Sequence, residues 1–208
     1  MAAHTPSSRS RPFTAAIHEL AGRADAAVLL DLEGTILFAN EAWDRFARTG
    51  AGFGEAVVGA KLLDGVPGDL LRSVLRQLLE RAAHKGGGPP ATMTSECNTP
   101  DVARLVITHV APVLAGNEPI GLTLVQRVVR ELPVAEVYPV VDGNAEGYRA
   151  GDGVLEQCSC CRRTRRPADP AEWDFVPALV AAPPDDTVFG YCPFCHELHN
   201  PLGTGGGR

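Results

Sequence analysis

Two Cys-x-x-Cys pairs in the last quarter of the chain constrain its folding more than any other feature. Cys158 and Cys161 form the first pair, and Cys192 and Cys195 form the second. The 30 residues that separate the pairs are enough for both pairs to reach one point. Four thiolates can then occupy the corners of a tetrahedron around one zinc ion. The spacing predicts a closed structural zinc site with these four cysteines as its ligands.

Three other uses of these cysteines compete with zinc. The run Cys192-Pro193-Phe194-Cys195-His196 also fits the attachment motif of c-type haem, and its first four residues fit a glutaredoxin-like redox site. Haem attachment would leave the first pair unexplained, and a glutaredoxin-like fold would need more than the 13 residues that follow Cys195. A disulfide-forming redox switch is compatible with the spacing and with zinc, because oxidation would eject the metal. This alternative stays open.

The ligand set carries one ambiguity. Cys160 lies inside the first pair, and His196 and His199 follow the second, so each of them could replace one of the four cysteines. Four cysteine ligands remain the simplest assignment. Four thiolates leave excess negative charge on a divalent ion, which the basic run Arg162–Arg166 could offset.

Charge is distributed unevenly along the chain. Residues 1–130 hold 13 basic and 13 acidic residues, whereas residues 131–208 hold 6 and 12, so the formal net charge of −6 comes from the C-terminal part. An acidic region repels polyanions, and nucleic acid is therefore not expected as a partner. The run Arg162–Arg166 is a local exception.

The composition is typical of a globular protein, with no expected membrane segment. No stretch approaches the roughly 18 consecutive apolar residues of a membrane span. Residues Met1–Arg11 are polar and basic and lack the apolar core of a secretory signal. We therefore expect a cytoplasmic protein, and in that compartment paired cysteines more often bind metals than form structural disulfides.

Hydrophobic periodicity predicts an α+β domain over residues 13–131. Asn40 is the expected N-cap of its second helix, because it directly precedes a run with helical spacing. The expected order is a helix over 13–23, strands over 26–31 and 35–39, a helix over 41–48, a longer helix over 67–84, and strands over 91–98, 102–114 and 120–130.

This order resembles that of a PAS sensor domain, and three segments resemble PAS sequences as well. They are VLLDLEGTILFANEAWDRFA, VVGAKLLD and HVAPVLAGNEPIGLTLVQRVVRE. The resemblance implies an antiparallel sheet with flanking helices, which often encloses a small ligand. In PAS proteins the first helix often mediates dimerisation, so we expect a homodimer formed through residues 13–23.

The resemblance does not identify a ligand for the cavity. The Asn-Cys-Arg-Phe-like motif of flavin photosensors is missing, and Cys97 falls in a predicted strand, where a small apolar filler is expected. His84 and His109 are the candidates for an axial haem ligand, and for both a solvent-facing or hydrogen-bonded role is expected. Neither haem nor flavin is expected.

The remaining residues predict a linker over 132–157, rich in Pro and Gly, and a zinc-binding module over 158–200. Disorder is expected over 1–12 and 201–208. The module resembles a Cys-rich segment that follows sensor domains in some bacterial signalling proteins. No kinase, cyclase or helix-turn-helix pattern and no catalytic residue set stands out, so no enzyme activity is expected.

The sequence thus predicts a cytoplasmic, bacterial-type signalling protein. A PAS-like sensor or interaction domain precedes a zinc-stabilised tail, and the protein presents a surface to a signalling partner. The main alternative is a redox- or zinc-responsive regulator that uses the cysteine tail as its sensor. The second is a regulator that binds nucleic acid through Arg162–Arg166.

Overall fold

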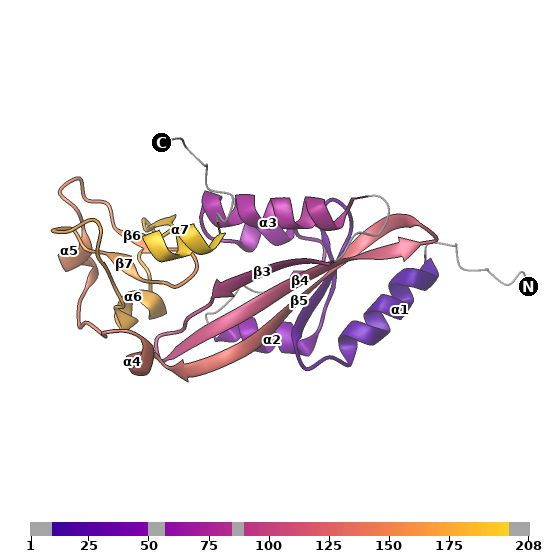
Figure 1. Ribbon diagram of the computed structural model, residues 1–208, viewed down its shortest axis with the longest axis horizontal. Helices are drawn as coiled ribbons and strands as arrows, with labels where there is room; N and C mark the ends of the chain where they lie inside the picture. The colour runs from indigo at the N-terminus through magenta and orange to yellow at the C-terminus, as the bar shows by residue number, and fades with distance from the viewer. Residues whose placement is uncertain (1–9, 50–56, 85–89, 200–208) are drawn as a thin grey trace, which may run out of the picture. The chain divides into compact units, whose positions relative to one another are not determined.

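The computed structural model describes residues 10–49, 57–84 and 90–199 (Figure 1). It contains a five-stranded sheet in the order β2-β1-β5-β4-β3 and a four-stranded sheet in the order β8-β7-β6-β9. The chain divides into two compact units. The first consists of the described residues of Met1–Val66, Leu75–Met93 and Thr108–Arg127, and the second of those of Pro67–Val74, Thr94–Ile107 and Val128–Arg208.

The eight helices and strands predicted for residues 13–131 are present in the predicted order. They are α1 (Ser10–Ala21), β1 (Ala26–Leu30), β2 (Ile36–Ala39), α2 (Glu41–Arg48), α3 (Asp69–Ala82), β3 (Ala91–Glu96), β4 (Val102–Ala115) and β5 (Glu118–Pro133), with a short 3-10 helix η1 (Leu62–Gly65) before α3. Helix α1 begins at Ser10 rather than at the predicted Phe13. Residues 10–12, predicted to be disordered, therefore belong to α1. The rest of the predicted disorder, residues 1–9 and 201–208, lies outside the described residues.

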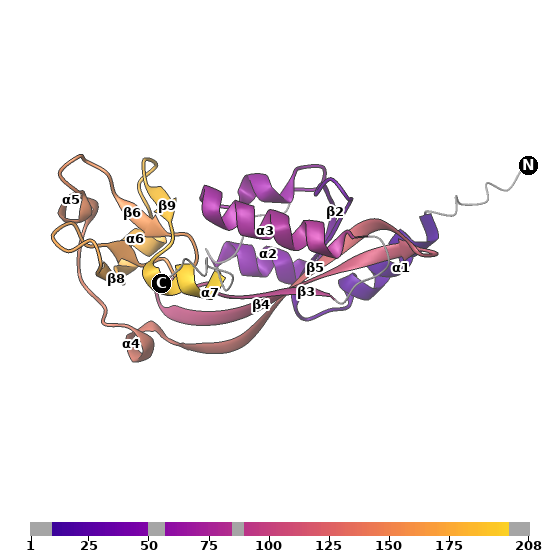
Figure 2. The ribbon, with the colours of Figure 1, turned by 45° about the horizontal axis from the view of Figure 1, so that its top comes forward.

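Strand β1 is the buried centre of the first unit. All five of its residues are buried, and it pairs antiparallel with both β2 and β5. Ala27 and Leu29 belong to a core cluster that includes Leu20 of α1. Because side chains alternate along a strand, Val28 and Leu30 point to the opposite face. Both α1 and α2 contact β1, and Figures 1 and 2 show β4 and β5 as a long, twisted hairpin.

Asn40 is an N-cap, as predicted, and it also fixes the connection between α1 and β1. Its Oδ1 accepts hydrogen bonds from the backbone amides of Trp43, at 2.9 Å, and Ala27, at 3.0 Å. Its Nδ2 donates to the carbonyls of Leu20 and Asp25, at 3.1 and 2.9 Å. The side chain is 3% exposed, so one buried amide satisfies several backbone groups that have no water to bind.

Gly121 in β5 leaves no space for a side chain. A Cβ added there would lie 2.6 Å from the carbonyl oxygen of Leu30 and 2.6 Å from a ring carbon of Phe13. We expect Gly121→Ala to lower the free energy of unfolding by about 1–3 kcal/mol, as overpacking does. At Gly22 the nearest atom would be 3.9 Å away, so Gly22→Ala should change stability by less than about 1 kcal/mol. Urea unfolding of both variants checks this, and equal effects would contradict it.

The C-terminal part of the second unit is built from short elements. They are α4 (Val134–Val137), α5 (Ala145–Tyr148), β6 (Glu156–Cys158), β7 (Thr164–Arg165), β8 (Trp173–Asp174), α6 (Pro177–Ala181), β9 (Val188–Gly190) and α7 (Pro193–His199). Strand β6 pairs antiparallel with β7 and parallel with β9. Two small clusters form its core, one around Phe175 and Val180 and one around Leu155 and Leu179.

The segment 132–157, predicted to be a linker, contains α4 and α5. Val134 of α4 is buried in the cluster around Phe175, and Tyr148 of α5 in the cluster around Leu155. Each helix has a single turn, too short for a helical period to show in the sequence. Within residues 10–49, 57–84 and 90–199, no helix is long and apolar enough to cross a membrane.

Candidate metal centre

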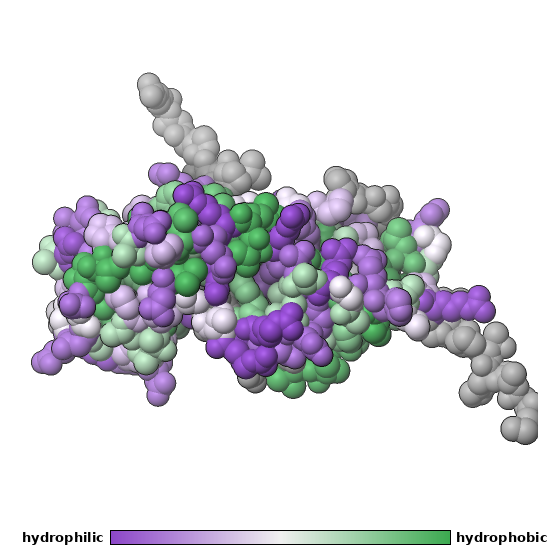
Figure 3. Space-filling view, turned by 90° about the horizontal axis from the view of Figure 1, so that it is seen from below, coloured by the Kyte–Doolittle hydropathy of each residue, from purple (hydrophilic) through white to green (hydrophobic). Residues whose placement is uncertain are grey.

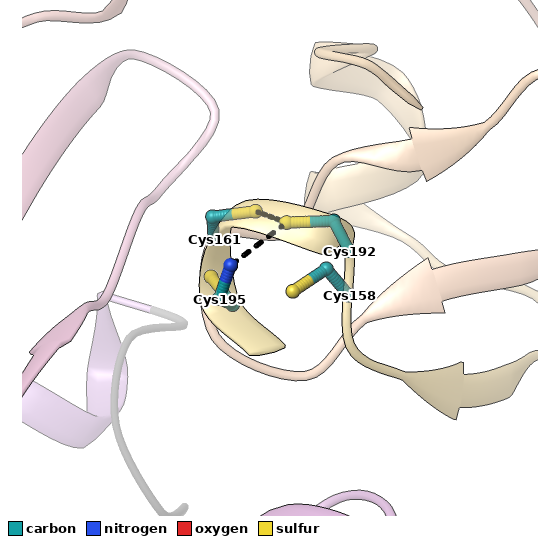
Figure 4. Close-up of side chains that lie close together, drawn as sticks. All are labelled: Cys158, Cys161, Cys192 and Cys195. Atoms are coloured by element: carbon teal, nitrogen blue, oxygen red, sulfur yellow. Dashed lines mark hydrogen bonds between the residues drawn. The ribbon is translucent and has the colours of Figure 1, made fainter. Parts of the chain in front are cut away.

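The structure brings the four predicted ligand residues together. Cys158 ends β6, Cys161 lies in the turn after it, Cys192 directly precedes α7, and Cys195 lies within α7. Their sulfur atoms all lie within 4.8 Å of one another, and the Sγ atoms of Cys161 and Cys192 are 3.6 Å apart. All four side chains are fully buried. Figure 4 shows the four sulfurs around one point.

Backbone turns aim each pair at this point. In the first pair, the amide of Arg162 donates to the carbonyl of Cys158 at 3.1 Å, and Arg162 has a φ of 64°. A left-handed backbone is uncommon outside glycine, and here it closes the turn between the two cysteines and β7. In the second pair, the amide of Cys195 donates to the Sγ of Cys192 at 3.5 Å. Such amide–sulfur bonds orient and stabilise thiolate ligands.

Arg163 spans both cysteine pairs. Its Nε donates to the Sγ of Cys161 and its Nη2 to the Sγ of Cys192, both at 3.3 Å. The guanidinium also lies over two aromatic rings, 5.2 Å from the centroid of Tyr138 and 5.9 Å from that of Phe194. A cation is thus held against the sulfurs, where it offsets the negative charge of thiolates.

The donor set fits zinc. With a zinc–sulfur distance of about 2.3 Å, a regular tetrahedron places its sulfurs about 3.8 Å apart, close to the 3.6 Å between Cys161 and Cys192. Burial raises the pKa of the Cys161 thiol, and the neighbouring Cys158 and Cys192 raise it further, so an ionised cluster needs a cation at its centre. Four soft, buried ligands leave no open coordination position, which is typical of structural zinc sites.

The alternative ligands lie beside this group. Cys160 is 4% exposed, and its Sγ lies 3.4 Å from the Nε2 of His199. The ring of His199 lies 5.3 Å from that of Tyr191. His196 is exposed on α7. Cys160 is therefore a buried thiol next to the four clustered cysteines, with a histidine as its own partner.

The four arginines of the basic run all have partners within the second unit. Besides Arg163, three of them contact acidic or aromatic side chains. These pairs are Arg162 with the ring of Phe189 at 5.5 Å, Arg165 with Glu156 at 2.6 Å, and Arg166 with Asp174 at 2.6 Å. The Arg166 guanidinium lowers the pKa of the Asp174 carboxyl. Much of the positive charge of this run is therefore compensated locally.

The other candidates from the sequence lie elsewhere. His84 is exposed just after α3, and His109 is half-buried on β4. His109 lines a groove of about 580 Å³ between α1 and the neighbouring strands. Cys97 follows β3 and is partly exposed.

Two residues that no motif marks also reach the metal centre. Asn98 donates a hydrogen bond from Nδ2 to the carbonyl of Cys161 at 2.9 Å, across 63 residues of sequence. Tyr138 supplies one of the rings beside Arg163. Asn98 falls at the end of the strand predicted over 91–98, and no motif in the sequence links either residue to the cysteines.

No protein-family model matches the chain, and no curated protein matches it. Among solved structures, the PAS domain of Bordetella pertussis BvgS is similar over 61% of this chain and 91% of its own, with 19% identity and a TM-score of 0.47. A Rhodobacter sphaeroides LOV protein is similar over 58% and 68%, with 15% identity and a TM-score of 0.42. The PAS domain of an HTR-like protein from Haloarcula marismortui is similar over 58% and 99%, with 15% identity and a TM-score of 0.36.

The predicted antiparallel sheet with flanking helices is present, and PAS domains are among the solved structures to which the chain is similar. The tight group of four cysteines near the C-terminus is compatible with a small metal-binding module. At these identities the likeness concerns the fold alone, so a function has to be argued from the residues of this chain.

Proposed function

We propose that this chain is a signalling or regulatory protein in which a PAS-like sensor or interaction domain is joined to a structural zinc site. The observation that carries the proposal is the buried group of four cysteine sulfurs within 4.8 Å of one another. Zinc held by Cys158, Cys161, Cys192 and Cys195 would have no position open for a substrate. The protein would then act by presenting a surface to a partner, not by catalysis.

A structural metal suits the small core of the C-terminal part. Strands of two or three residues and helices of four to seven residues bury few side chains, and cores of this size usually need a metal or disulfides to be stable. A reducing, cytoplasmic setting would keep the thiols free to bind zinc. Zinc bound there would join the turn after β6 to α7, two segments about 30 residues apart.

Exposed apolar side chains support a protein partner. Val129 on β5, Val137 on α4 and Val140 after it are 44%, 41% and 42% exposed. On the face that Figure 3 shows, hydrophobic residues lie at the surface among hydrophilic ones. We retain the homodimer as part of the proposal. Ile17, however, packs against the core cluster around Leu29, so a dimer through α1 would have to use the other face of that helix.

Zinc content and thiol reactivity test the proposal. We expect one zinc per chain, slow metal exchange, and four thiols that become reactive only after chelation. Purified protein without bound metal would contradict it. Rapidly exchanging metal together with a reactive thiol would instead favour a redox- or zinc-responsive regulator. The observation that supports this alternative is Cys160, a thiol beside the cluster that a four-cysteine site does not need.

Arg163→Gln should weaken zinc binding about 10–100-fold, the usual effect of removing a partner of the metal ligands. The substitution removes a cation that donates to two sulfurs. Arg165→Gln is the matched control, because Arg165 pairs with Glu156 and not with sulfur. Competition with a chromophoric chelator measures both affinities. Equal affinities for the two variants would show that Arg163 does not support the metal.

A further inference from the structure

We infer that metal binding at the cysteine cluster holds the β3–β4 turn, residues 97–101, in place, so that the adjoining ends of β3 and β4 respond to the state of the metal centre. The inference rests on the proposed zinc site. The turn, the cysteines and the residues that link them all belong to the second compact unit. Two separate links connect them.

The first link is the side chain of Asn98. Its Nδ2 donates to the carbonyl of Cys161 at 2.9 Å, and its Oδ1 accepts from the amide of Arg104 on β4 at 2.9 Å. Asn98 is 1% exposed. Because no water can replace a partner at such a site, breaking either hydrogen bond leaves buried polar groups unpaired, which costs free energy. A shift of Cys161 would therefore disturb the turn, and a shift of the turn would disturb Cys161.

The second link is the ring of Tyr138. Its hydroxyl donates to the carboxylate of Glu96, the last residue of β3, and its ring stacks on Phe175 with centroids 5.5 Å apart. On this ring lies Arg163, which donates to the sulfurs of both cysteine pairs. The two links thus reach the chain on either side of Cys97, at Glu96 and at Asn98.

The turn between them is closed by hydrogen bonds of its own. The amide of Thr99 donates to the carbonyl of Val102, and the amide of Cys97 donates to the carbonyl of Arg104, both at 2.9 Å. These amides report on the order of the turn, because they exchange with solvent only when it opens. If bound zinc raises the equilibrium constant for closing the turn, thermodynamic linkage requires that closing the turn raises the affinity for zinc by the same factor.

Reciprocity gives the first test. In the full chain, Asn98→Ala should weaken the affinity for zinc on the order of tenfold, equivalent to about 1.4 kcal/mol. Asn144→Ala is the matched control, since Asn144 caps α5 in the same unit by a bond to the amide of Gly147. The control should change zinc affinity by less than about threefold. Chelator competition with zinc alone measures both.

Hydrogen exchange gives the second test, and it uses the wild-type chain. Removing zinc should speed exchange at the amides of Cys97, Thr99 and Arg104 by about tenfold or more. The amide of Asn40, bonded to the carbonyl of Ala27 in the first unit, should keep its exchange rate.

If Asn98→Ala does not fold, Tyr138→Phe replaces it in the affinity test. That variant keeps the ring and removes the hydroxyl that donates to Glu96, and it should weaken zinc binding by about threefold or more.

The possible outcomes separate this inference from the proposal on which it rests. If the wild type binds zinc, but its turn amides exchange equally with and without the metal and the Asn98 or Tyr138 variant keeps wild-type affinity, the coupling is absent and the zinc site stands. If the wild type binds no zinc, the proposed function fails and the inference fails with it.

Discussion

Replacing Cys192 by Ser should abolish metal binding and unfold the C-terminal module, whereas Cys160→Ser should preserve both. Cys192 contributes one of the four clustered sulfurs and accepts hydrogen bonds from Arg163 and from the amide of Cys195. A serine hydroxyl is neither soft nor ionised at neutral pH, so it does not replace a thiolate on zinc. Structural zinc contributes roughly 10–16 kcal/mol to the folding of small modules, as much as or more than the net stability of most domains.

Cys160→Ser is a demanding control because Cys160, like Cys192, is buried and lies between two of the clustered cysteines in the sequence. Cys160 contacts His199 at 3.4 Å and is not one of the four clustered sulfurs, so a cost below about 1.5 kcal/mol is expected. Metal content, circular dichroism and limited proteolysis compare the variants. The reverse pattern, with metal lost from the Cys160 variant and kept by the Cys192 variant, would show that the ligand set is different.

Asn40→Ala should strongly destabilise the first unit. It removes an N-cap and leaves the amide of Ala27 and the carbonyls of Leu20 and Asp25 without their buried partner. Each unpaired buried group costs about 1–3 kcal/mol, and partial rearrangement leaves an expected loss of about 3–5 kcal/mol.

The same deletion at another N-cap provides the comparison. Asn144 is exposed and makes one capping bond, to the amide of Gly147, so Asn144→Ala should cost about 0.5–1 kcal/mol. Urea unfolding, followed by tryptophan fluorescence for Asn40→Ala because Trp43 adjoins the site, measures the difference. A loss at Asn40 no larger than that at Asn144 would mean that its additional bonds do not stabilise the fold.

The sequence predicted those parts of the fold in which a local pattern repeats. The apolar stripe of α3 and the long, nearly continuous apolar run of β4 extend over enough residues to be recognised. Asn40 was predicted as a cap because capping depends on neighbours within a few residues. The four cysteine ligands were predicted from their spacing alone. Two Cys-x-x-Cys pairs can bind one metal ion whenever the loop between them brings the second pair back to the first.

The remainder depends on contacts between distant parts of the chain. Strand β6 pairs with β9, which follows about 30 residues later, and both are too short to show alternation. Asn98 and Tyr138 meet the cysteine turn through folding that no local pattern specifies. The arginine run was predicted to offset the charge of the thiolates or, as an alternative, to bind nucleic acid. A count of charges does not reveal that Arg163 binds sulfur or that Arg166 binds Asp174.

X-ray absorption at the zinc edge of the purified protein tests the central claim most directly. The proposed site, built from Cys158, Cys161, Cys192 and Cys195, predicts one zinc per chain with four sulfur ligands at about 2.3 Å and no nitrogen ligand. A nitrogen ligand at about 2.0 Å would mean that His196 or His199 replaces a cysteine. Protein that binds no zinc would contradict the metal centre altogether.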